Sequence, residues 1–234
     1  ETTLDSMRAN WVAACLNFSE TAAEQILNQA FSMFPVEAVC VEVLQKGMSE
    51  IGAKWYENQA SVQQEHFASG LAMRRLDALL IASPAPSRPY TILVGCPAGE
   101  WHTFTPLMLS LFLRRRGYNV IYLGANVPAD RFEETVHAVR AHLVILASQT
   151  LVSAASLQKT AIILTSKNIP IGYGGRIFNI RPEILKHISG HHLGNEVSAA
   201  LNEVEHILNG KRKSLQLQAP SQEYIAAHQF FTSK

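Results

Sequence analysis

Apolar residues in the first third of the chain recur at the spacing of an amphipathic helix. The steps of three and four residues begin with Leu4, Met7, Trp11 and Cys15. In the last helical segment, one face is shared by Val62, His66, Met73 and Leu76. Helical segments with short connections predict an antiparallel four-helix bundle over residues 1–82, with His66 on an apolar face.

The pattern changes at residues 83–89, where S-P-A-P-S-R-P cannot continue a helix because each Pro lacks a donor and restricts its predecessor. We expect a linker there. Beyond it, short β-branched runs alternate with helical segments, which predicts parallel strands joined by helices. Five such units over residues 90–210 predict an α/β, flavodoxin-like (Rossmann-like) domain with a five-stranded parallel sheet. Residues 211–234 are expected to be a C-terminal tail, with one more amphipathic helix at 221–231.

Composition narrows the class of protein. With 234 residues and 47% hydrophobic positions, the chain can bury a sizeable core. A net charge of +1 argues against a broad nucleic-acid surface, and no apolar run approaches the length of a membrane span. The start has no signal-peptide pattern, and the odd, scattered cysteines suggest neither a disulfide framework nor a zinc site. We therefore expect a cytoplasmic protein that does not contact a membrane.

Candidate binding residues follow three of the predicted strands. They are Glu100 and His102 after the first strand, Ser148 and Thr150 after the third, and Gly174 and Gly175 after the fourth. Because the carboxyl ends of parallel strands share one edge, we expect these loops to converge on a ligand. Simpler interpretations stay open: Ser148 and Thr150 can cap the next helix, and the glycines can form an ordinary turn.

The helical part adds a second candidate group. Glu65 precedes His66, and Trp55 lies near the end of the preceding helix. A core histidine with a surface glutamate and a core tryptophan is the simpler interpretation. A buried histidine needs partners for both ring nitrogens, so it can equally face a polar ligand.

A four-helix bundle joined to this sheet, with E-x-H in the first loop, resembles the cobalamin-binding modules over roughly residues 4–210. In that family the histidine replaces the cofactor's own base and binds cobalt from below. The resemblance implies that His102 is the metal ligand and that Glu100 orients its imidazole. Ser148-Gln149-Thr150 and Gly174-Gly175 match the loops that line the channel for the nucleotide tail.

The bundle resembles one group in particular, the CarH-type light-responsive transcription regulators of the MerR family. Trp55, nine further residues and Glu65-His66 match their W-x9-E-H motif. The resemblance implies that the bundle caps adenosylcobalamin, with Trp55 and Val62 near the adenosyl group and Glu65 and His66 on its polar parts. It also implies a dark homo-oligomer, a dimer of dimers, that light takes apart. DNA would be bound only through an N-terminal domain that this sequence does not contain.

Two positions depart from the family pattern. Thr105 stands where the family has Gly, which adds bulk beside the path of the nucleotide tail, and Tyr56 replaces a histidine that can bind cobalt after illumination. Two alternatives therefore stay open: a sensor of another tetrapyrrole, haem or a bilin, and a corrinoid carrier of a methyltransferase system. The sequence shows no base–nucleophile set or phosphate-binding loop, so we expect no catalytic residues and no enzyme activity of its own.

Overall fold

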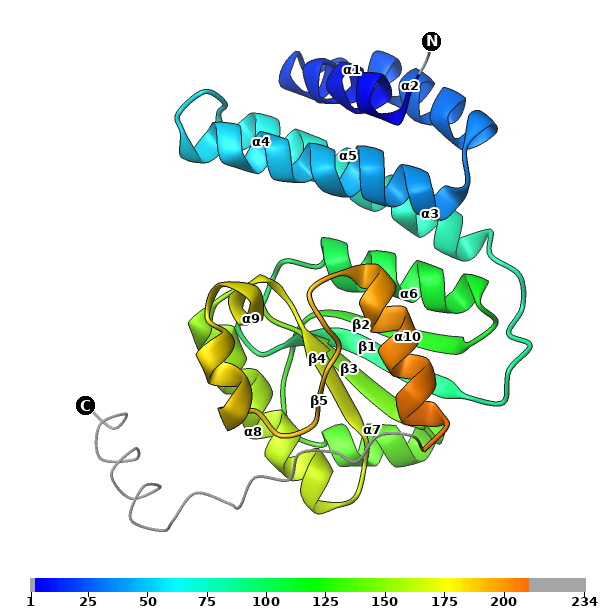
Figure 1. Cartoon of the computed structure of the whole chain (residues 1–234), viewed down its shortest axis with the longest axis vertical. Helices are drawn as coiled ribbons and strands as arrows, with labels where there is room; N and C mark the ends of the chain where they lie inside the picture. The colour runs from blue at the N-terminus through cyan, green and yellow to red at the C-terminus, as the bar shows by residue number, and fades with distance from the viewer. Residues whose placement is uncertain (1–2, 211–234) are drawn as a thin grey trace. The chain divides into compact units, whose positions relative to one another are not determined.

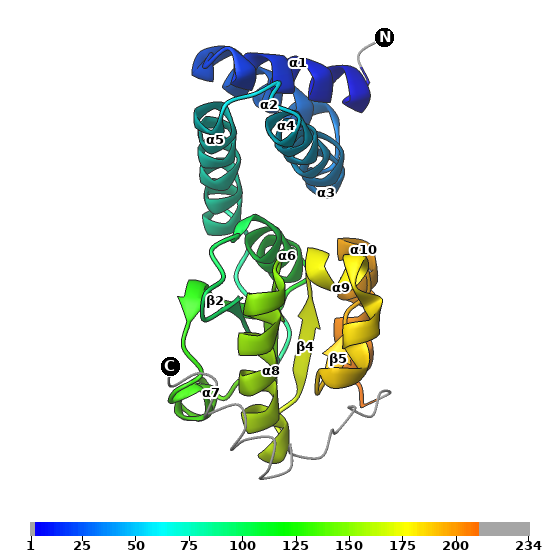
Figure 2. The same ribbon diagram turned by 90° about the vertical axis from the view of Figure 1, so that its left-hand side faces the viewer.

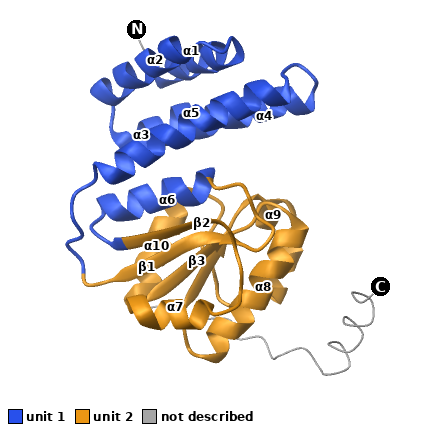
Figure 3. Cartoon of the chain, turned by 180° about the vertical axis from the view of Figure 1, so that it is seen from behind, with its two compact units in different colours: residues 1–88, 104–119 blue, residues 89–103, 120–234 orange. Residues whose placement is uncertain are grey.

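The computed structural model describes residues 3–210. The predicted C-terminal tail and its helix at 221–231 lie outside the described residues. Contacts divide the chain into two compact units, one of residues 1–88 and 104–119 and the other of residues 89–103 and 120–234 (Figure 3). Within the described range, no helix is both long and apolar enough to cross a membrane.

The first unit is helical (Figure 1). Its elements are α1 (Leu4–Leu16), α2 (Glu20–Met33), α3 (Val36–Val39), η1 (Cys40–Gln45), α4 (Lys46–Tyr56), α5 (Val62–Ile81) and α6 (Phe104–Arg115). The first part of this unit is the predicted bundle, in which α1 contacts α2, α4 and α5. The helix of the first βα unit, α6, packs on α5. The chain before β1 is also held here, because the amides of Ser87 and Arg88 both donate to the Gly117 carbonyl at 2.9 Å.

The bundle is centred on Trp11, which is fully buried. A Cβ at Gly47 would approach the Trp11 ring to 2.9 Å, so the helix can pass the indole only with glycine there. Just before this contact the third helix is not regular: α3 and α4 are joined by the π-helical stretch η1. A π-helix has a wider turn than an α-helix, so η1 changes which residues of α4 face α1.

The buried face of α5 differs from the prediction. Its buried residues are Ala68, Leu71, Ala72 and Leu76. Val62 is exposed and 75% of the His66 side chain is accessible, so the simpler interpretation of His66 as a core histidine is wrong. Small alanines allow close packing of α5 on its neighbours, and this moves the buried stripe around the helix.

The second unit contains the five-stranded parallel sheet. Its elements are β1 (Thr91–Pro97), β2 (Asn119–Val127), α7 (Phe132–Val139), β3 (Leu143–Ala147), α8 (Leu151–Ser166), β4 (Ile171–Gly174), α9 (Arg176–Ile180), η2 (Pro182–His187), β5 (His191–His192) and α10 (Val197–Leu208). The strand order β2-β1-β3-β4-β5 is the flavodoxin-like order that the sequence predicts. The order reverses between β1 and β3, which pair from Ile92 with Leu143 to Gly95 with Leu146.

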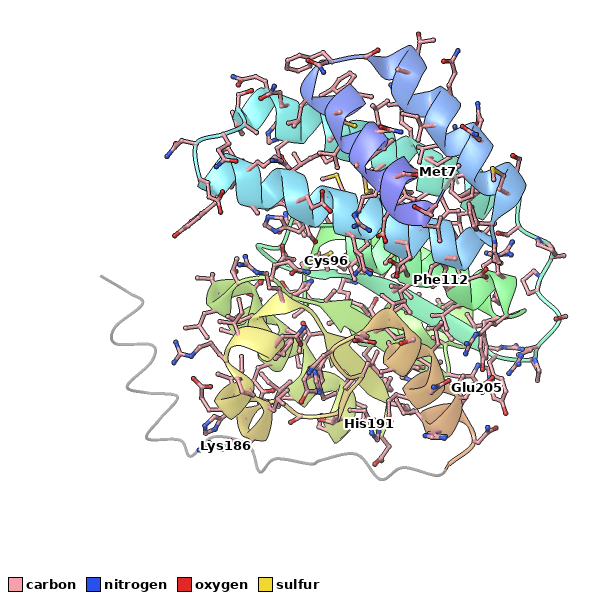
Figure 4. The ribbon with its side chains drawn as sticks, turned by 45° about the horizontal axis from the view of Figure 1, so that its top comes forward. Met7, Cys96, Phe112, Lys186, His191 and Glu205 are labelled. Atoms are coloured by element: carbon pink, nitrogen blue, oxygen red, sulfur yellow. The ribbon has the colours of Figure 1, made fainter. Side chains whose placement is uncertain are left out.

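Helices cover both faces of this sheet: α7 and α8 lie on one side and α10 on the other (Figures 1 and 2). Alternate residues of β3 and β4, among them Val144 and Tyr173, join Leu93 of β1 in a core with α7 and α8. In Figure 4, Cys96 marks the carboxyl end of β1 and His191 marks β5. The packed layers fix the strand ends, and therefore the loops that carry the candidate residues.

Candidate functional site

The loop after β1 joins a buried carboxylate to an exposed imidazole. Glu100 is 1% exposed, whereas 69% of the His102 side chain is accessible. The His102 Nδ1 lies 2.6 Å from Glu100 Oε1. The two residues that the E-x-H pattern singles out are therefore in direct contact, at the strand end next to the switch in strand order.

Both oxygens of the Glu100 carboxylate accept several hydrogen bonds. Oε1 accepts from the Trp101 and His102 amides at 3.0 Å, in addition to the imidazole. Oε2 accepts from the Gln149 amide and from Ser153 Oγ, each at 2.6 Å. Burial by itself acts to raise the pKa of Glu100, but the hydrogen bonds from Ser153, Gln149 and His102 outweigh it and hold that pKa below its ordinary value. Glu100 is therefore ionised at neutral pH.

The ionised carboxylate fixes the chemistry of the imidazole. A carboxylate can only accept hydrogen bonds, so the Nδ1 of His102 carries the proton and donates it. The lone pair of the neutral ring is then on Nε2, on an accessible side chain. Metal-binding histidines are commonly held in this way, with the second ring nitrogen donating to a carboxylate. The arrangement can supply one nitrogen ligand to a metal that brings its other ligands with it.

The loops after β3 and β4 touch each other at Ser148 and Gly175. The Ser148 amide donates to the Gly174 carbonyl at 3.0 Å. Gly175 has φ 122°, and a Cβ there would overlap the Ser148 carbonyl, so only glycine fits. Gly174 is under no such constraint, because a Cβ there would meet no atom within 4 Å.

Thr150 caps the following helix, which is the simpler of the two roles predicted for it. It is the N-cap of α8, and it exchanges hydrogen bonds with Ser153 in a capping box. This cap places Ser153 Oγ against Glu100. Sequence reasoning missed Ser153 and Gln149 as partners of Glu100. The T-x-x-S spacing after the third strand is a sequence signal for Ser153, whereas a backbone donor such as Gln149 leaves none.

The helical candidates lie in the other compact unit. Glu65 Oε2 lies 2.7 Å from His66 Nδ1, so this pair also leaves its Nε2 free of the carboxylate. Trp55, near the end of α4, is 49% exposed, and Tyr56 next to it is more exposed still. Thr105 lies in the first turn of α6, and its φ is not positive, so threonine is accommodated without backbone strain.

The loop residues of the sheet unit fit a corrinoid. His102 offers a nitrogen lone pair, as a cobalt ligand must. The Ser148 hydroxyl is buried and has no hydrogen-bond partner among residues 3–210, which is a costly state unless a ligand satisfies it. Of the glycines beside it, Gly174 has open space where a ligand can approach the backbone, whereas Gly175 packs against the Ser148 backbone.

Comparison with known proteins agrees with this chemistry. Two family models, both described as "B12 binding domain", match residues 7–80 and 90–196. The chain is 35% identical over 123 residues to the HTH-type transcriptional repressor CarA of Myxococcus xanthus, covering 52% of this chain and 41% of CarA. It is 26% identical over 190 residues to the repressor CarH of the same organism, covering 80% of this chain and 63% of CarH. The chain thus spans less than two thirds of either relative.

The fold also matches a solved structure. The monomethylamine corrinoid protein of Methanosarcina barkeri superposes with a TM-score of 0.72, covering 87% of this chain and 99% of that one, at 15% sequence identity. This match confirms the predicted architecture of a helical bundle with a Rossmann-like domain. The family models indicate a cobalamin or related corrinoid as the cofactor. The chain belongs to the B12-binding family.

Proposed function

We propose that the chain is the adenosylcobalamin-binding sensory part of a light-responsive transcription regulator, with His102 as the lower cobalt ligand. The observation that carries this proposal is the contact between Glu100 and His102 at the switch point of the sheet, in a chain that B12-binding models match. The proposed role is sensory and not catalytic.

Each residue of the sheet unit has a task in this proposal. Glu100 keeps the proton on Nδ1 of His102, so the Nε2 lone pair is directed to the metal. The buried hydroxyl of Ser148 would bond a polar atom of the nucleotide tail, and Gly174 would leave room for that tail, whereas Gly175 lets its loop pack against the Ser148 backbone. The cofactor supplies a cobalt–carbon bond that light can cleave.

In this proposal, residues of the helical unit would contact the adenosyl group. Trp55 and Val62 offer exposed apolar surface, and Glu65 and His66 offer a polar pair. The half-exposed indole of Trp55 offers apolar surface that a ligand can cover, which is compatible with a binding role for Trp55. Because Tyr56 replaces the second histidine of the family, the state after illumination must use another ligand or none.

The likeness to CarA and CarH supports a link to transcription. DNA binding would be carried by a further domain of the whole protein, and the sensor would control it through a change in oligomeric state, from a dark dimer of dimers to smaller species. Such a switch requires that the intact cofactor binds the two assembly states with different affinity.

A corrinoid carrier of a methyltransferase system is the second candidate, and the fold likeness to a corrinoid protein keeps it open. Trp55, Glu65 and His66 favour the sensor, since a methyl carrier must leave its upper face accessible to partner enzymes. The B12-binding matches favour a corrinoid over haem or a bilin.

The test is reconstitution of the purified protein with adenosylcobalamin in the dark, followed by green light. We expect a corrinoid spectrum that changes irreversibly with light, together with a later elution volume in gel filtration. A Soret band in protein purified from cells would instead indicate haem. A light-stable methylated cobalt species that transfers its methyl group to a thiol would indicate the carrier.

A further inference from the structure

Gln149 connects the loop that holds the imidazole to the loop that carries the two glycines. Its backbone amide donates to Glu100 Oε2 at 2.6 Å. Its side-chain Oε1 accepts from the Arg176 amide at 3.1 Å. We infer that Gln149 is a positioning residue that transmits the occupancy of the Gly174–Gly175 loop to His102. This inference rests on the proposed function, because it assumes a corrinoid with a nucleotide tail.

The connection is continuous from one loop to the other. The Arg176 amide follows directly after Gly175, whose φ of 122° and close approach to the Ser148 carbonyl leave that loop little freedom. Arg176 bonds the Gln149 side chain, and the Gln149 amide bonds one oxygen of Glu100. The other oxygen of that carboxylate bonds His102 Nδ1. A displacement of the glycine loop therefore reaches the imidazole through three hydrogen bonds and one rigid carboxylate.

The main chain of Glu100 is anchored independently. Its carbonyl accepts from the Asn126 amide at 2.9 Å, and Asn126 Oδ1 accepts from the Gly99 amide at 2.8 Å. With the backbone held by the end of β2, the carboxylate is held on one side by the Trp101 and His102 amides and on the other by the Gln149 amide and Ser153 Oγ. Gln149 therefore supplies part of the hold that orients the imidazole, and it is the part that reaches the glycine loop.

This geometry predicts a coupling between two parts of the same cofactor. A nucleotide tail against Gly174 and Gly175 holds Arg176 and Gln149 in place, and so stabilises the orientation in which His102 binds cobalt. A corrinoid without the tail loses that contribution. The coupling is a free energy between two subsites, of the kind that usually changes an affinity by about 5- to 150-fold.

The experiment compares cobalamin with cobinamide, which has the same macrocycle without the nucleotide. Protein labelled with 15N-histidine is loaded with each corrinoid in the cobalt(II) state, and electron paramagnetic resonance reports whether the axial nitrogen comes from the protein. For both corrinoids we measure the ratio of cobalt that is ligated by His102 to cobalt that is not ligated by His102. In the wild type we expect a higher ratio with cobalamin.

The variant is Gln149→Met, which keeps the side-chain length and removes the acceptor for Arg176. We expect the cobalamin-to-cobinamide advantage to fall about fivefold or more. The matched control is Gln158→Met, because Gln158 lies on α8, the helix that follows Gln149, and accepts from the Ser189 amide at 2.9 Å, away from Glu100. It should leave the advantage unchanged.

A second readout keeps the result interpretable. Amide hydrogen exchange at Arg176 should accelerate in Gln149→Met and not in Gln158→Met. An unchanged cobalamin advantage, or an unchanged exchange rate at Arg176, would overturn the inference. If neither corrinoid binds, or if His102→Ala gives the same spectra as the wild type, the proposed function fails instead, and the two failures are distinguished.

Discussion

The imidazole of His102 and the carboxylate of Glu100 are 2.6 Å apart, Nδ1 to Oε1, while the other carboxylate oxygen is bound from the start of α8. The imidazole is thus oriented by groups from two strand ends. A ligand held in this way loses less conformational entropy when it binds a metal.

Ser153→Ala removes a donor from the buried Glu100 carboxylate. Loss of one hydrogen bond to a buried charged group should lower the free energy of unfolding by about 1–3 kcal/mol, part of it from the lost helix cap. Urea unfolding followed by circular dichroism measures it. Ser156→Ala is the control, since Ser156 Oγ bonds only an α8 carbonyl on the exposed side, and a similar loss there would contradict the account.

Gly175→Ala should destabilise the sheet unit, whereas Gly174→Ala should not. Gly175 has a φ of 122°, and a Cβ there would overlap the Ser148 carbonyl. A side chain forced into such a position should lower the free energy of unfolding by about 1–3 kcal/mol or more. Gly174 has open space for a Cβ. The measurement is the difference in unfolding midpoint between the two variants, and equal midpoints would refute the constraint.

Stability should fall as the pH drops from 7 to 5, in part because of His192. Burial lowers the pKa of His192 below its ordinary value of 6.5, against a smaller opposing effect of the charge of Glu203. The unfolded chain therefore binds a proton near pH 6.5 that the folded chain binds only at lower pH, so stability is lost through that window. His192→Phe, which suits the contacts with Tyr173 and Phe178, should flatten the pH profile of the unfolding free energy. An unchanged slope would show that His192 does not cause it.

Two tryptophans of the helical unit should respond very differently to alanine. Trp11 is fully buried, so Trp11→Ala should cost about 3–5 kcal/mol of folding free energy. Trp55 is 49% exposed, so Trp55→Ala should change stability by about 1 kcal/mol or less and instead weaken retention of adenosylcobalamin in the dark. Thermal melts and the dissociation rate of the cofactor give the two readings. Strong destabilisation by Trp55→Ala with unaltered cofactor retention would make Trp55 a structural residue.

Residue patterns predicted the architecture and the contact between Glu100 and His102. The alternation of strands and helices gave the parallel sheet, and the shared edge of parallel strands brought the loops after β1 and β3 together. The spacing of Glu100 and His102 is local, so one loop was enough to predict their contact. The contacts of Gln149 could not be predicted from the sequence. One of its two hydrogen bonds is made by its backbone amide, a group that nearly every residue type has.

The helical unit was harder to predict in detail. The buried stripe of α5 contains Ala68 and Ala72, which a hydrophobic pattern ranks low, although their small size is what permits close helix packing. The π-helical stretch η1 ends just before Gly47, where the helix passes Trp11, a residue far away in the sequence. Tertiary packing determines both features, so spacing along the chain alone does not identify them.

The central claim is that His102 binds the metal of a corrinoid. The most direct test is the absorption spectrum of wild-type protein and of His102→Ala, each reconstituted in the dark with adenosylcobalamin. The account predicts that the wild type shows cobalt ligated by a protein imidazole and that His102→Ala shows the spectrum of cobalamin without it, with weaker retention. Identical spectra and equal retention in the two proteins would contradict it.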